Sequence, residues 1–455
     1  MAKISTTEVL AEFVCNLKPE KIPSATRESV KKCIADLIAA SIGGYSSDSA
    51  KHIRKISQAI FSEGPAGLWF AGVSRTVAGA VFANSAAASA LDLDDGHRAA
   101  GGHPGAAIIP AAFAAYEERR CDDETLIAAV VAGYEVAVRI GAARDFSRLD
   151  TLATGRWCSY GAAAAAGKIK GFKPGKLAQA LAIAGVQSPG LSAAGYSAIM
   201  GNHVKEGIPW SAVTGLVALE LAEQSFTGPT DILDHKDYYQ AEKILSDLGA
   251  GFAIDGVYFK PYACCRWIHS ALDGLERLMN DCNVAAKDIR SIRVDTFGRA
   301  LLLNNYPDPS TIEAAQYSIP FCLAVLAVDG KPALLPLDNS LLVRPDIIAL
   351  ARKIKLAVDP AFDAVFPAKV PARVRLAARG ETYETTIEDP LGDPGNPMDY
   401  RMIEEKLLGL SNKYLSPERQ GDLLKCLSST MNGSFSKLVN LLGSIKFLDP
   451  KMKRE

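Results

Sequence analysis

The chain has 455 residues, of which 48% are hydrophobic and 22% charged, and this globular composition excludes a disordered or collagen-like protein. Its 50 Lys and Arg residues against 51 Asp and Glu residues give a formal net charge of −1. A chain without surplus positive charge lacks the field that holds nucleic acid or an anionic membrane surface, so we expect neither partner. The length predicts two or three domains.

The cysteines and the apolar stretches indicate the compartment. Nine cysteines, an odd number, are spread widely along the chain and follow no basic-then-apolar leader, which predicts reduced thiols in the cytoplasm. The absence of any CxxC pair argues against a zinc ribbon or an iron–sulfur cluster, and we expect no metal. The longest apolar stretch, Leu126 to Ala143, contains Glu135 and Arg139, whose charges argue against a membrane span.

The first half of the chain is dominated by helical periodicity. Apolar residues recur every three or four positions from Ser29 to Ile42, which predicts an amphipathic helix ended by Gly43 and Gly44. Six further helices with many small residues are predicted at Val77–Ala90, Gly105–Tyr116, Asp123–Ala143, Gly161–Lys170, Pro174–Gly185 and Trp210–Gln224. Alanine favours helix and lets helix axes approach closely. We therefore predict that residues 1–258 form the first part of a large helical domain.

The pattern changes after residue 258. Alternating β-branched and apolar residues predict strands at Asp288–Phe297 and within Ala372–Ile387, where Arg379–Gly380–Glu381 forms a turn. Helices are predicted between them at Ala315–Leu326 and Pro345–Leu356. Residues 259–396 are therefore expected to form a smaller α+β domain.

A linker rich in Gly, Pro and Asp follows at residues 390–397. Helical periodicity then returns at Tyr400–Leu408, Ser416–Leu427 and Ser434–Leu448. We predict that residues 397–455 rejoin the first domain, so that the protein is mainly α, with a large all-helical domain and an α+β lid.

The densest polar cluster lies between two apolar helices. Asp92, Asp94 and Asp95 are followed within a few residues by His97 and His103. Burying such groups together costs several kcal/mol, because carboxylates lose their hydration, unless the groups are paired or used in catalysis. Gly and Pro residues around the second histidine suit a loop that approaches a ligand closely. The alternative interpretation is a polar knot that caps the two helices.

A second cluster lies at the expected domain boundary, where ligand sites are common. Lys260, Arg266 and His269 supply positive charge and a proton-transfer group there. The alternative is an ordinary hinge with a cation–π pair between Arg266 and Trp267. A nucleophilic pair of Cys265 and His269, one helical turn apart, would lack a third orienting group.

Two weaker candidates precede helices. Lys205 lies in the glycine-containing loop 201–207 and suits a base or a carboxylate anchor, or alternatively an ordinary solvated lysine. Arg156 precedes the alanine-rich helix and suits an anion site. The sequence contains no GxGxxG after a strand, no P-loop, no GxSxG and no HExxH. What remains is acid/base chemistry beside a carboxylate, with cations stabilising enolate-like charge.

Five blocks of the sequence, in the same order along the chain, resemble the MmgE/PrpD family. They are residues 90–97 with 103–105, residues 161–171, residues 226–229, residues 260–265, and residues 390–392 ahead of Pro397. The resemblance implies a cofactor-free homodimer with a large helical domain, a smaller α+β lid and an active site in the cleft between them. The family includes a 2-methylcitrate dehydratase, a cis-aconitate decarboxylase and an iminodisuccinate epimerase.

The resemblance also assigns residues. The family's aspartate-rich segment corresponds to Asp92, Asp94 and Asp95, its HP histidine to His103, its loop lysine to Lys205 and its boundary lysine to Lys260. Three departures are visible. No histidine precedes the alanine-rich helix, where Gly155–Cys158 stands, Glu206 and Gly207 follow the loop lysine, and Phe321 stands where many members have tyrosine.

We therefore expect a lyase that removes water by β-elimination from a 2-methylcitrate-like polycarboxylate, with decarboxylation or epimerisation as alternatives on the same scaffold. His103 is the expected acid or base, and Asp92 or Asp94 orients it or shares its proton. Lys205, Lys260 and Arg266 are expected to hold carboxylates, together with His97, Arg156 and His269. The other hypotheses are a magnesium-dependent class I terpene synthase, which the strand-rich region argues against, and a helical interaction protein without enzyme activity.

Overall fold

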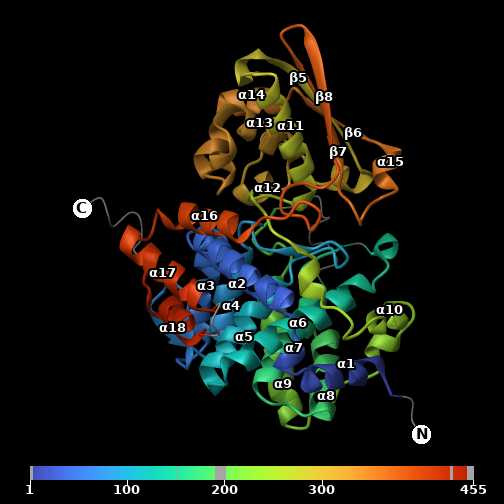
Figure 1. Ribbon diagram of the computed structural model, residues 1–455, viewed down its shortest axis with the longest axis vertical. Coiled ribbons are helices and arrows are strands. Elements are labelled where there is room, and N and C mark those ends of the chain that lie inside the picture. Colours follow the sequence, from blue (N-terminus) through green and yellow to red (C-terminus); the bar gives the residue numbers. More distant parts are fainter. Residues whose placement is uncertain (1–3, 150, 190–200, 431–433, 448–455) are drawn as a thin grey trace.

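The structure is a computed structural model that describes residues 4–149, 151–189, 201–430 and 434–447. Figure 1 shows a large helical part and, at the top of the view, a smaller part that contains strands β5 to β8. The fold is mainly helical with a smaller α+β part, as the sequence predicts.

Thirteen of the described helices build the helical part. They are α1 (Thr6–Asn16), α2 (Ser24–Gly44), α3 (Asp48–Ile60), α4 (Val77–Ser89), α5 (Gly105–Arg119), α6 (Asp123–Ala142), α7 (Cys158–Ile169), α8 (Pro174–Val186), α9 (Ile208–Glu223), α10 (Ala241–Leu245), α16 (Tyr400–Ser411), α17 (Pro417–Thr430) and α18 (Ser436–Ser444). All seven helices predicted before residue 258 are present, and α1, α3 and α10 are additional.

Small residues allow the central helices to pack closely. Helix α7 packs against α5, α6 and α9. Where it meets α6, a Cβ atom added to Gly161 would lie 2.8 Å from the carbonyl oxygen of Gly133, so a larger residue would push the helices apart. The alanine and glycine pattern thus accounts for the compact helical core.

The smaller part contains a four-stranded sheet with the order β6-β5-β7-β8. Its strands are β5 (Ile289–Thr296), β6 (Ile354–Val358), β7 (Ala372–Ala378) and β8 (Glu381–Ile387). β6 pairs in parallel with β5, whereas the other pairs are antiparallel. The predicted β7–β8 hairpin is confirmed, and its two turn residues, Arg379 and Gly380, have φ angles of 53° and 85°, as a tight hairpin turn requires.

Five helices accompany this sheet. They are α11 (His269–Asp281), α12 (Ile312–Ala315), α13 (Ile319–Asp329), α14 (Pro345–Ala351) and α15 (Pro360–Asp363). α11 packs against β7 and β8.

Two predicted helix boundaries in this region are wrong. The helix predicted over Pro345–Leu356 ends at Ala351, because the residues from Ile354 onward pair with β5 as strand β6. The helix predicted from Ala315 begins only at Ile319, because the Ser318 side chain accepts a hydrogen bond from the backbone N–H of Phe321 and caps α13 there. In both cases a partner outside the local pattern decides the boundary.

Two hydrophobic cores follow this division. The larger core takes buried residues from Leu10 to Ala263 and again from Met398 to Phe447, and the smaller takes residues from Tyr262 to Ala378. α16 packs against α2, and α18 packs against β1 (Ala66–Leu68), so the C-terminal helices return to the helical part. We propose that these cores correspond to two domains divided near residues 258 and 396.

Short strands bring the two candidate clusters of the sequence together. β1 pairs with β2 (Val73–Arg75), and β3 (Gly96–His97) pairs with β4 (Val257–Tyr258). The second pairing places the aspartate-rich segment beside the segment that contains Lys260, which lies 168 positions after Asp92 in the chain. The site therefore depends on a contact between distant segments.

Helix α6 is long and apolar enough to cross a membrane, but 83% of the apolar window lies buried inside the protein. Its neighbours are α5 and α7. A core helix of this kind passes the same length and composition test as a membrane span. All nine cysteines lie in described residues and are free.

Candidate active site

The aspartate-rich loop directly follows helix α4 and is buried. Asp92, Asp94 and Asp95 are at most 4% exposed. Asp92 has a φ angle of 53°, a left-handed conformation that Asp adopts more readily than most residues. The loop thus turns sharply and directs several carboxylates into the protein interior.

Asp95 holds the beginning of helix α5. Its Oδ1 accepts a hydrogen bond from the N–H of Gly105 at 3.0 Å, and its Oδ2 accepts one from the Tyr134 hydroxyl at 2.5 Å. A Cβ atom at Gly105 would lie 2.5 Å from Oδ1, so glycine is required for this approach. Burial raises the pKa of Asp95 to about 7, although the Tyr134 hydrogen bond opposes this shift.

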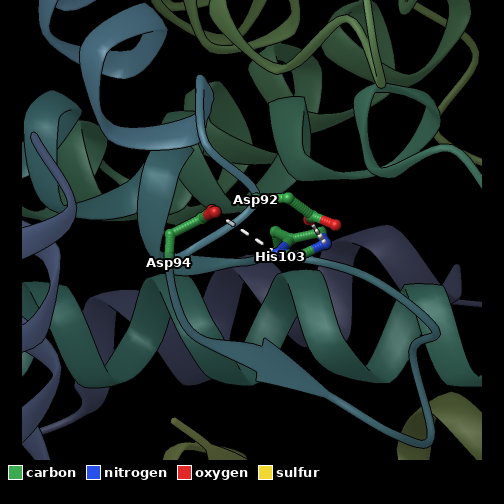
Figure 2. Close-up of side chains that lie close together, drawn as sticks. All are labelled: Asp92, Asp94 and His103. Atoms are coloured by element: carbon green, nitrogen blue, oxygen red, sulfur yellow. Dashed lines mark ion pairs between the residues drawn. The ribbon is translucent and has the colours of Figure 1, made fainter. Parts of the chain in front are cut away.

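His103 lies at the centre of the cluster (Figure 2). Its Nε2 is 3.2 Å from Oδ1 of Asp92, and its Nδ1 is 3.5 Å from Oδ2 of Asp94. Nδ1 is also 3.1 Å from the carbonyl oxygen of Asp95. Because a carbonyl oxygen can only accept, Nδ1 carries the proton of this bond, which leaves Nε2 to exchange a proton with a ligand.

Lys260 lies behind Asp92 and is fully buried. Its ammonium donates to the carbonyl oxygen of Asp92 at 3.0 Å and to Oδ1 at 2.9 Å. Burial would raise the pKa of Asp92, but the charges of Lys260 and Lys205 outweigh it and hold this pKa below its usual value. Burial would lower the pKa of Lys260, but Asp92 raises it above its usual value. Both groups are therefore charged, and Lys260 orients Asp92.

Asp94 differs from its neighbour. Its Oδ2 has no hydrogen-bond partner, and burial raises the pKa of its carboxyl group, while His103 and Lys260 oppose the shift. The pKa values of the two carboxyl groups that flank His103 are therefore shifted in opposite directions. This arrangement is expected where one group stays ionised and another can hold a proton.

Lys205 contacts the C-terminal end of helix α4. Its ammonium donates to the carbonyl oxygens of Ser89 and Ala90 at 3.1 and 3.2 Å and to Oε1 of Gln316 at 2.9 Å. A helix C-terminus carries partial negative charge and stabilises a cation. These three oxygens belong to neutral groups, and no carboxylate in the described part of the chain forms a direct ion pair with Lys205, so its charge is available to an anion.

Glu206, which the sequence reasoning did not select, completes the cluster. Its Oε1 lies 3.7 Å from Nε2 of His103. Its other oxygen, Oε2, accepts hydrogen bonds from the N–H of Thr154, at 2.9 Å, and from the Thr154 hydroxyl. The Thr154 hydroxyl oxygen in turn accepts the N–H of His103 at 3.0 Å. The signal for Glu206 in the sequence was the departure from the family pattern directly after Lys205.

Two cavities open beside these groups. The first, of about 20 Å³, is lined by Asp92, Asp94, His103 and Lys205 among others. The second, of about 80 Å³, lies between the helical part and the α+β part. His103, Glu206 and Tyr317 line both cavities, so the two spaces adjoin at the candidate acid/base group. Both volumes exceed the space that a single buried water needs.

Arg266 and His269 have structural partners. Arg266 donates to Asp393 at 2.6 Å and to the carbonyl oxygens of Pro390 and Leu391. His269 lies between Nη1 of Arg266, at 3.0 Å, and the carbonyl oxygen of Cys264, at 3.1 Å, and it does not line either cavity. In this position His269 supports Arg266, and its predicted contact with substrate stays a prediction.

Arg98 is a further cation that the sequence reasoning did not select. It lines the second cavity and pairs with Oδ2 of Asp393, whose other oxygen pairs with Arg266. Two guanidinium groups thus share one carboxylate, which leaves a surplus positive charge in this wall.

His97 and Arg156 are placed differently from one another. His97 lines the second cavity, but burial lowers its pKa to about 4, so it is neutral at pH 7 and adds no positive charge. Arg156 is half-buried and is not among the residues that line the two cavities. The predicted role of Arg156 in direct substrate binding therefore has no support from this geometry.

A tyrosine near Phe321 lines the cavities, although Phe321 itself does not. Phe321 is fully buried in the smaller core and lines neither cavity. Tyr317, one turn earlier in the chain, lines both. Burial, with a contribution from Asp92, raises the pKa of Tyr317 well above its ordinary value, so it remains a phenol.

Asp92, Asp94 and His103 each offer a ligand atom within 4.8 Å of the others, a spacing that suits a metal ion. The ammonium of Lys260 already lies 2.9 Å from the same Asp92 oxygen. A cation therefore balances this carboxylate from within the protein, and we derive no step that needs a metal ion.

Comparisons with known proteins agree with this architecture. The MmgE/PrpD N-terminal domain matches residues 8–243, and the MmgE/PrpD C-terminal domain matches residues 262–428. A cis-aconitate decarboxylase from Aspergillus terreus is 29% identical, over 92% of this chain and 91% of its own. A cis-aconitate decarboxylase-like protein, oryM, from Aspergillus oryzae is 26% identical, over 91% and 92%. These similarities support a lyase-type enzyme. The chain belongs to the MmgE/PrpD family.

Proposed function

We propose that this protein is a cofactor-independent lyase that acts on a small di- or tricarboxylate, and that decarboxylation of a cis-aconitate-like acid is its first candidate reaction. The observation that carries the proposal is the position of His103, which lines the same cavity as Lys205. Relatives at 29% and 26% identity that are named for decarboxylation of cis-aconitate favour this reaction among those of the family.

In this reaction the C–C bond to the leaving carboxylate breaks and carbon dioxide departs. The electron pair remains on carbon, conjugated to a neighbouring group, as an enolate-like anion that Lys205 stabilises. His103 lies among oxygen atoms of Asp92, Asp94, Asp95 and Glu206. An imidazole ring in this position is placed to pass a proton to the carbanion.

The second candidate is β-elimination of water from a 2-methylcitrate-like hydroxy acid. It is favoured by the ionised carboxylate of Asp92 at 3.2 Å from Nε2 of His103. Elimination needs a base for the α-proton and an acid for the departing hydroxyl group, and this pair supplies both. Epimerisation would use the same base without loss of a group.

Product analysis separates these reactions. The purified enzyme is incubated in heavy water with cis-aconitate and, separately, with 2-methylcitrate, and the products are followed by NMR. Carbon dioxide release, loss of water, or deuterium exchange without loss of mass identifies decarboxylation, dehydration or epimerisation, respectively. If neither acid nor related polycarboxylates react, the proposed function is wrong.

His103→Ala tests the role of the ring. We expect kcat to fall about 10² to 10⁴-fold, the range for loss of an acid/base group. His235→Ala is the matched control, because His235 is exposed and lines neither cavity. Unchanged turnover in His103→Ala would remove His103 from the mechanism.

We also propose that the enzyme is a cytoplasmic homodimer that needs no metal or other cofactor, as family membership implies. Nine free cysteines favour a reducing compartment. Light scattering after size exclusion tests the dimer, and retention of activity after chelation with EDTA tests the metal-free mechanism.

A further inference from the structure

We propose that the second cavity binds an apolar substituent of the substrate, so that the preferred substrate is a polycarboxylate carrying an alkyl or aryl group larger than methyl. This inference rests on the proposed function and narrows its substrate class. It starts from the contrast between the walls of the two cavities, because Lys205 lines the first and the second is lined mostly by apolar side chains.

The walls of the second cavity are largely apolar on both sides. Phe146 and Leu152 come from the helical part, and Trp267, Leu303 and Phe366 come from the α+β part. Phe146, Trp267 and Phe366 are only half-buried, so each leaves part of its ring facing this space. Covering partly exposed aromatic rings with an apolar group is favourable, because it removes apolar surface from water.

The aromatic wall of the α+β part is held in place by packing. The ring of Phe366 stacks on Phe297 with centroids 4.7 Å apart, and Trp267 meets both rings edge-on at 5.7 Å. Phe297 is fully buried in the smaller core. A wall anchored in this way is pre-organised and does not have to be built when a ligand enters.

Most of the polar groups that line the second cavity are already engaged. His103 and Glu206 also line the first cavity. Arg266 is paired with Asp393 and donates to carbonyl oxygens, and His97 is neutral. Arg98 retains surplus charge next to Asp393 and suits a second carboxylate of the same ligand. The other described residues that line this cavity carry no positive charge, so a third carboxylate there would lose its hydration without gaining a partner.

The junction fixes which part of the ligand enters each space. With one carboxylate beside Lys205 and the reacting carbon beside Nε2 of His103, a substituent on the neighbouring carbon extends past Glu206 and Tyr317 into the second cavity. The same acid/base group therefore serves ligands with or without the substituent, whereas affinity depends on how much apolar surface is covered.

Four succinates that differ in a single substituent test this inference by isothermal titration calorimetry on the full-length protein. The probes are succinate, propylsuccinate, hexylsuccinate and carboxymethylsuccinate. We expect Kd to fall about fourfold for each methylene that becomes buried, and carboxymethylsuccinate to bind more weakly than propylsuccinate. The dicarboxylate core is common to all four, so the comparison isolates the group that enters the second cavity.

A matched pair of variants locates the effect. Phe366→Ala is expected to reduce the ratio between the Kd of succinate and that of hexylsuccinate about tenfold, because the alkyl chain then covers less apolar surface. Val365→Ala is the control, because Val365 is the neighbouring residue, is 41% exposed and does not line the cavity. It should leave the ratio unchanged.

The outcomes separate the inference from the function on which it rests. If succinate binds and the alkyl chains give no gain, or if carboxymethylsuccinate binds more tightly than propylsuccinate, the apolar subsite is wrong and the lyase proposal stands. If Phe366→Ala leaves the ratio intact, the chain lies elsewhere and the inference is also wrong. If no probe binds and no polycarboxylate is turned over, the proposed function fails as well.

Discussion

The Oε1 atom of Glu206 lies 3.7 Å from Nε2 of His103, while the other oxygen of the same carboxylate is held by Thr154. Thr154 also receives the backbone N–H of His103. Hydrogen bonds through Thr154 and an electrostatic contact with Glu206 thus join segments from three parts of the chain around the candidate acid. Since Glu206 stands between the two cavities, its charge affects both the ring and any ligand.

Glu206→Gln keeps the size of this side chain and removes its charge. We expect kcat to fall about 10- to 100-fold, with a smaller change in KM, because the contact of the ring with a charged group is worth roughly 1.5–3 kcal/mol. Steady-state kinetics checks this. Thr154→Val should lower kcat through loss of the same alignment, whereas Thr154→Ser keeps the hydroxyl group and should restore it. A rise in KM alone would show that Glu206 acts only on substrate binding.

Substitution of the two lysines of the site is expected to have different effects. Lys205→Met removes a charge that faces the first cavity, so KM for a polycarboxylate should rise about 10- to 100-fold, the value of a hydrogen bond to a charged group. Lys260→Met leaves the Asp92 carboxylate buried without its cation, which should lower the free energy of unfolding by about 3–5 kcal/mol. Kinetics and urea unfolding measure the two effects, with Lys236→Met, at an exposed lysine, as the control.

An additional substitution identifies the cause of the second effect. Lys260→Met combined with Asp92→Asn removes both charges, so the double variant should be more stable than Lys260→Met alone. If the two stability losses simply add, the ammonium and the carboxylate do not interact as the 2.9 Å contact implies.

Asp95 should impose a pH dependence on stability. Its pKa is raised to about 7 by burial, so between about pH 4 and pH 7 the folded protein holds a proton that the unfolded chain has released. The free energy of unfolding then decreases as pH rises across this window, by at most about 1.4 kcal/mol per pH unit, and the loss is complete above about pH 7.

Asp95→Asn removes this proton uptake and retains a side chain of the same shape. Urea unfolding at several pH values should show that the difference in stability between the variant and the wild type grows in favour of the variant from pH 4 to pH 7. Asp237→Asn, at an exposed aspartate, serves as the control. Parallel pH profiles for wild type and Asp95→Asn would show that Asp95 is ionised in the folded protein at pH 5.

A buried ion pair ties the C-terminal helices to the site. Lys406 of α16 donates to Oδ1 of Asp36 at 2.6 Å and to the carbonyl oxygen of Leu93 at 2.8 Å, between Asp92 and Asp94. Lys406→Met should lower the free energy of unfolding by about 3–5 kcal/mol, because the Asp36 carboxylate stays buried without a cation. Burial raises the pKa of Asp36, although Lys406 opposes the shift, which is consistent with a costly carboxylate.

The double variant Asp36→Leu with Lys406→Met tests the pairing. Replacing both charges with apolar groups should recover most of the stability lost in Lys406→Met, as measured by urea unfolding. Activity should stay reduced, because the Leu93 carbonyl oxygen loses its donor and the aspartate-rich loop loses a fixed point. Full recovery of kcat in the double variant would show that Lys406 does not position the loop.

The helical part was largely predictable from the sequence. The alanine-rich pattern of α7 and the stripe of α2 specify helix locally, because propensity and periodicity depend on neighbouring residues alone. The β7–β8 hairpin was predictable for the same reason, since its two-residue turn and alternating pattern are local signals. Strand β6 was not predictable in this way, because it pairs in parallel with β5, which lies about sixty positions earlier in the chain.

The sequence by itself determined the fold class and the family resemblance. It also identified Asp92, Asp94 and His103 as a polar cluster, because a group of charged residues between two apolar helices is visible in the sequence alone. Only the tertiary structure decided which cations are available. Lys260 and Arg266 are committed to internal carboxylates, whereas Lys205 faces a cavity with only neutral partners, and Glu206 reaches His103. Burial and partner choice depend on contacts between distant segments, and no local pattern encodes them.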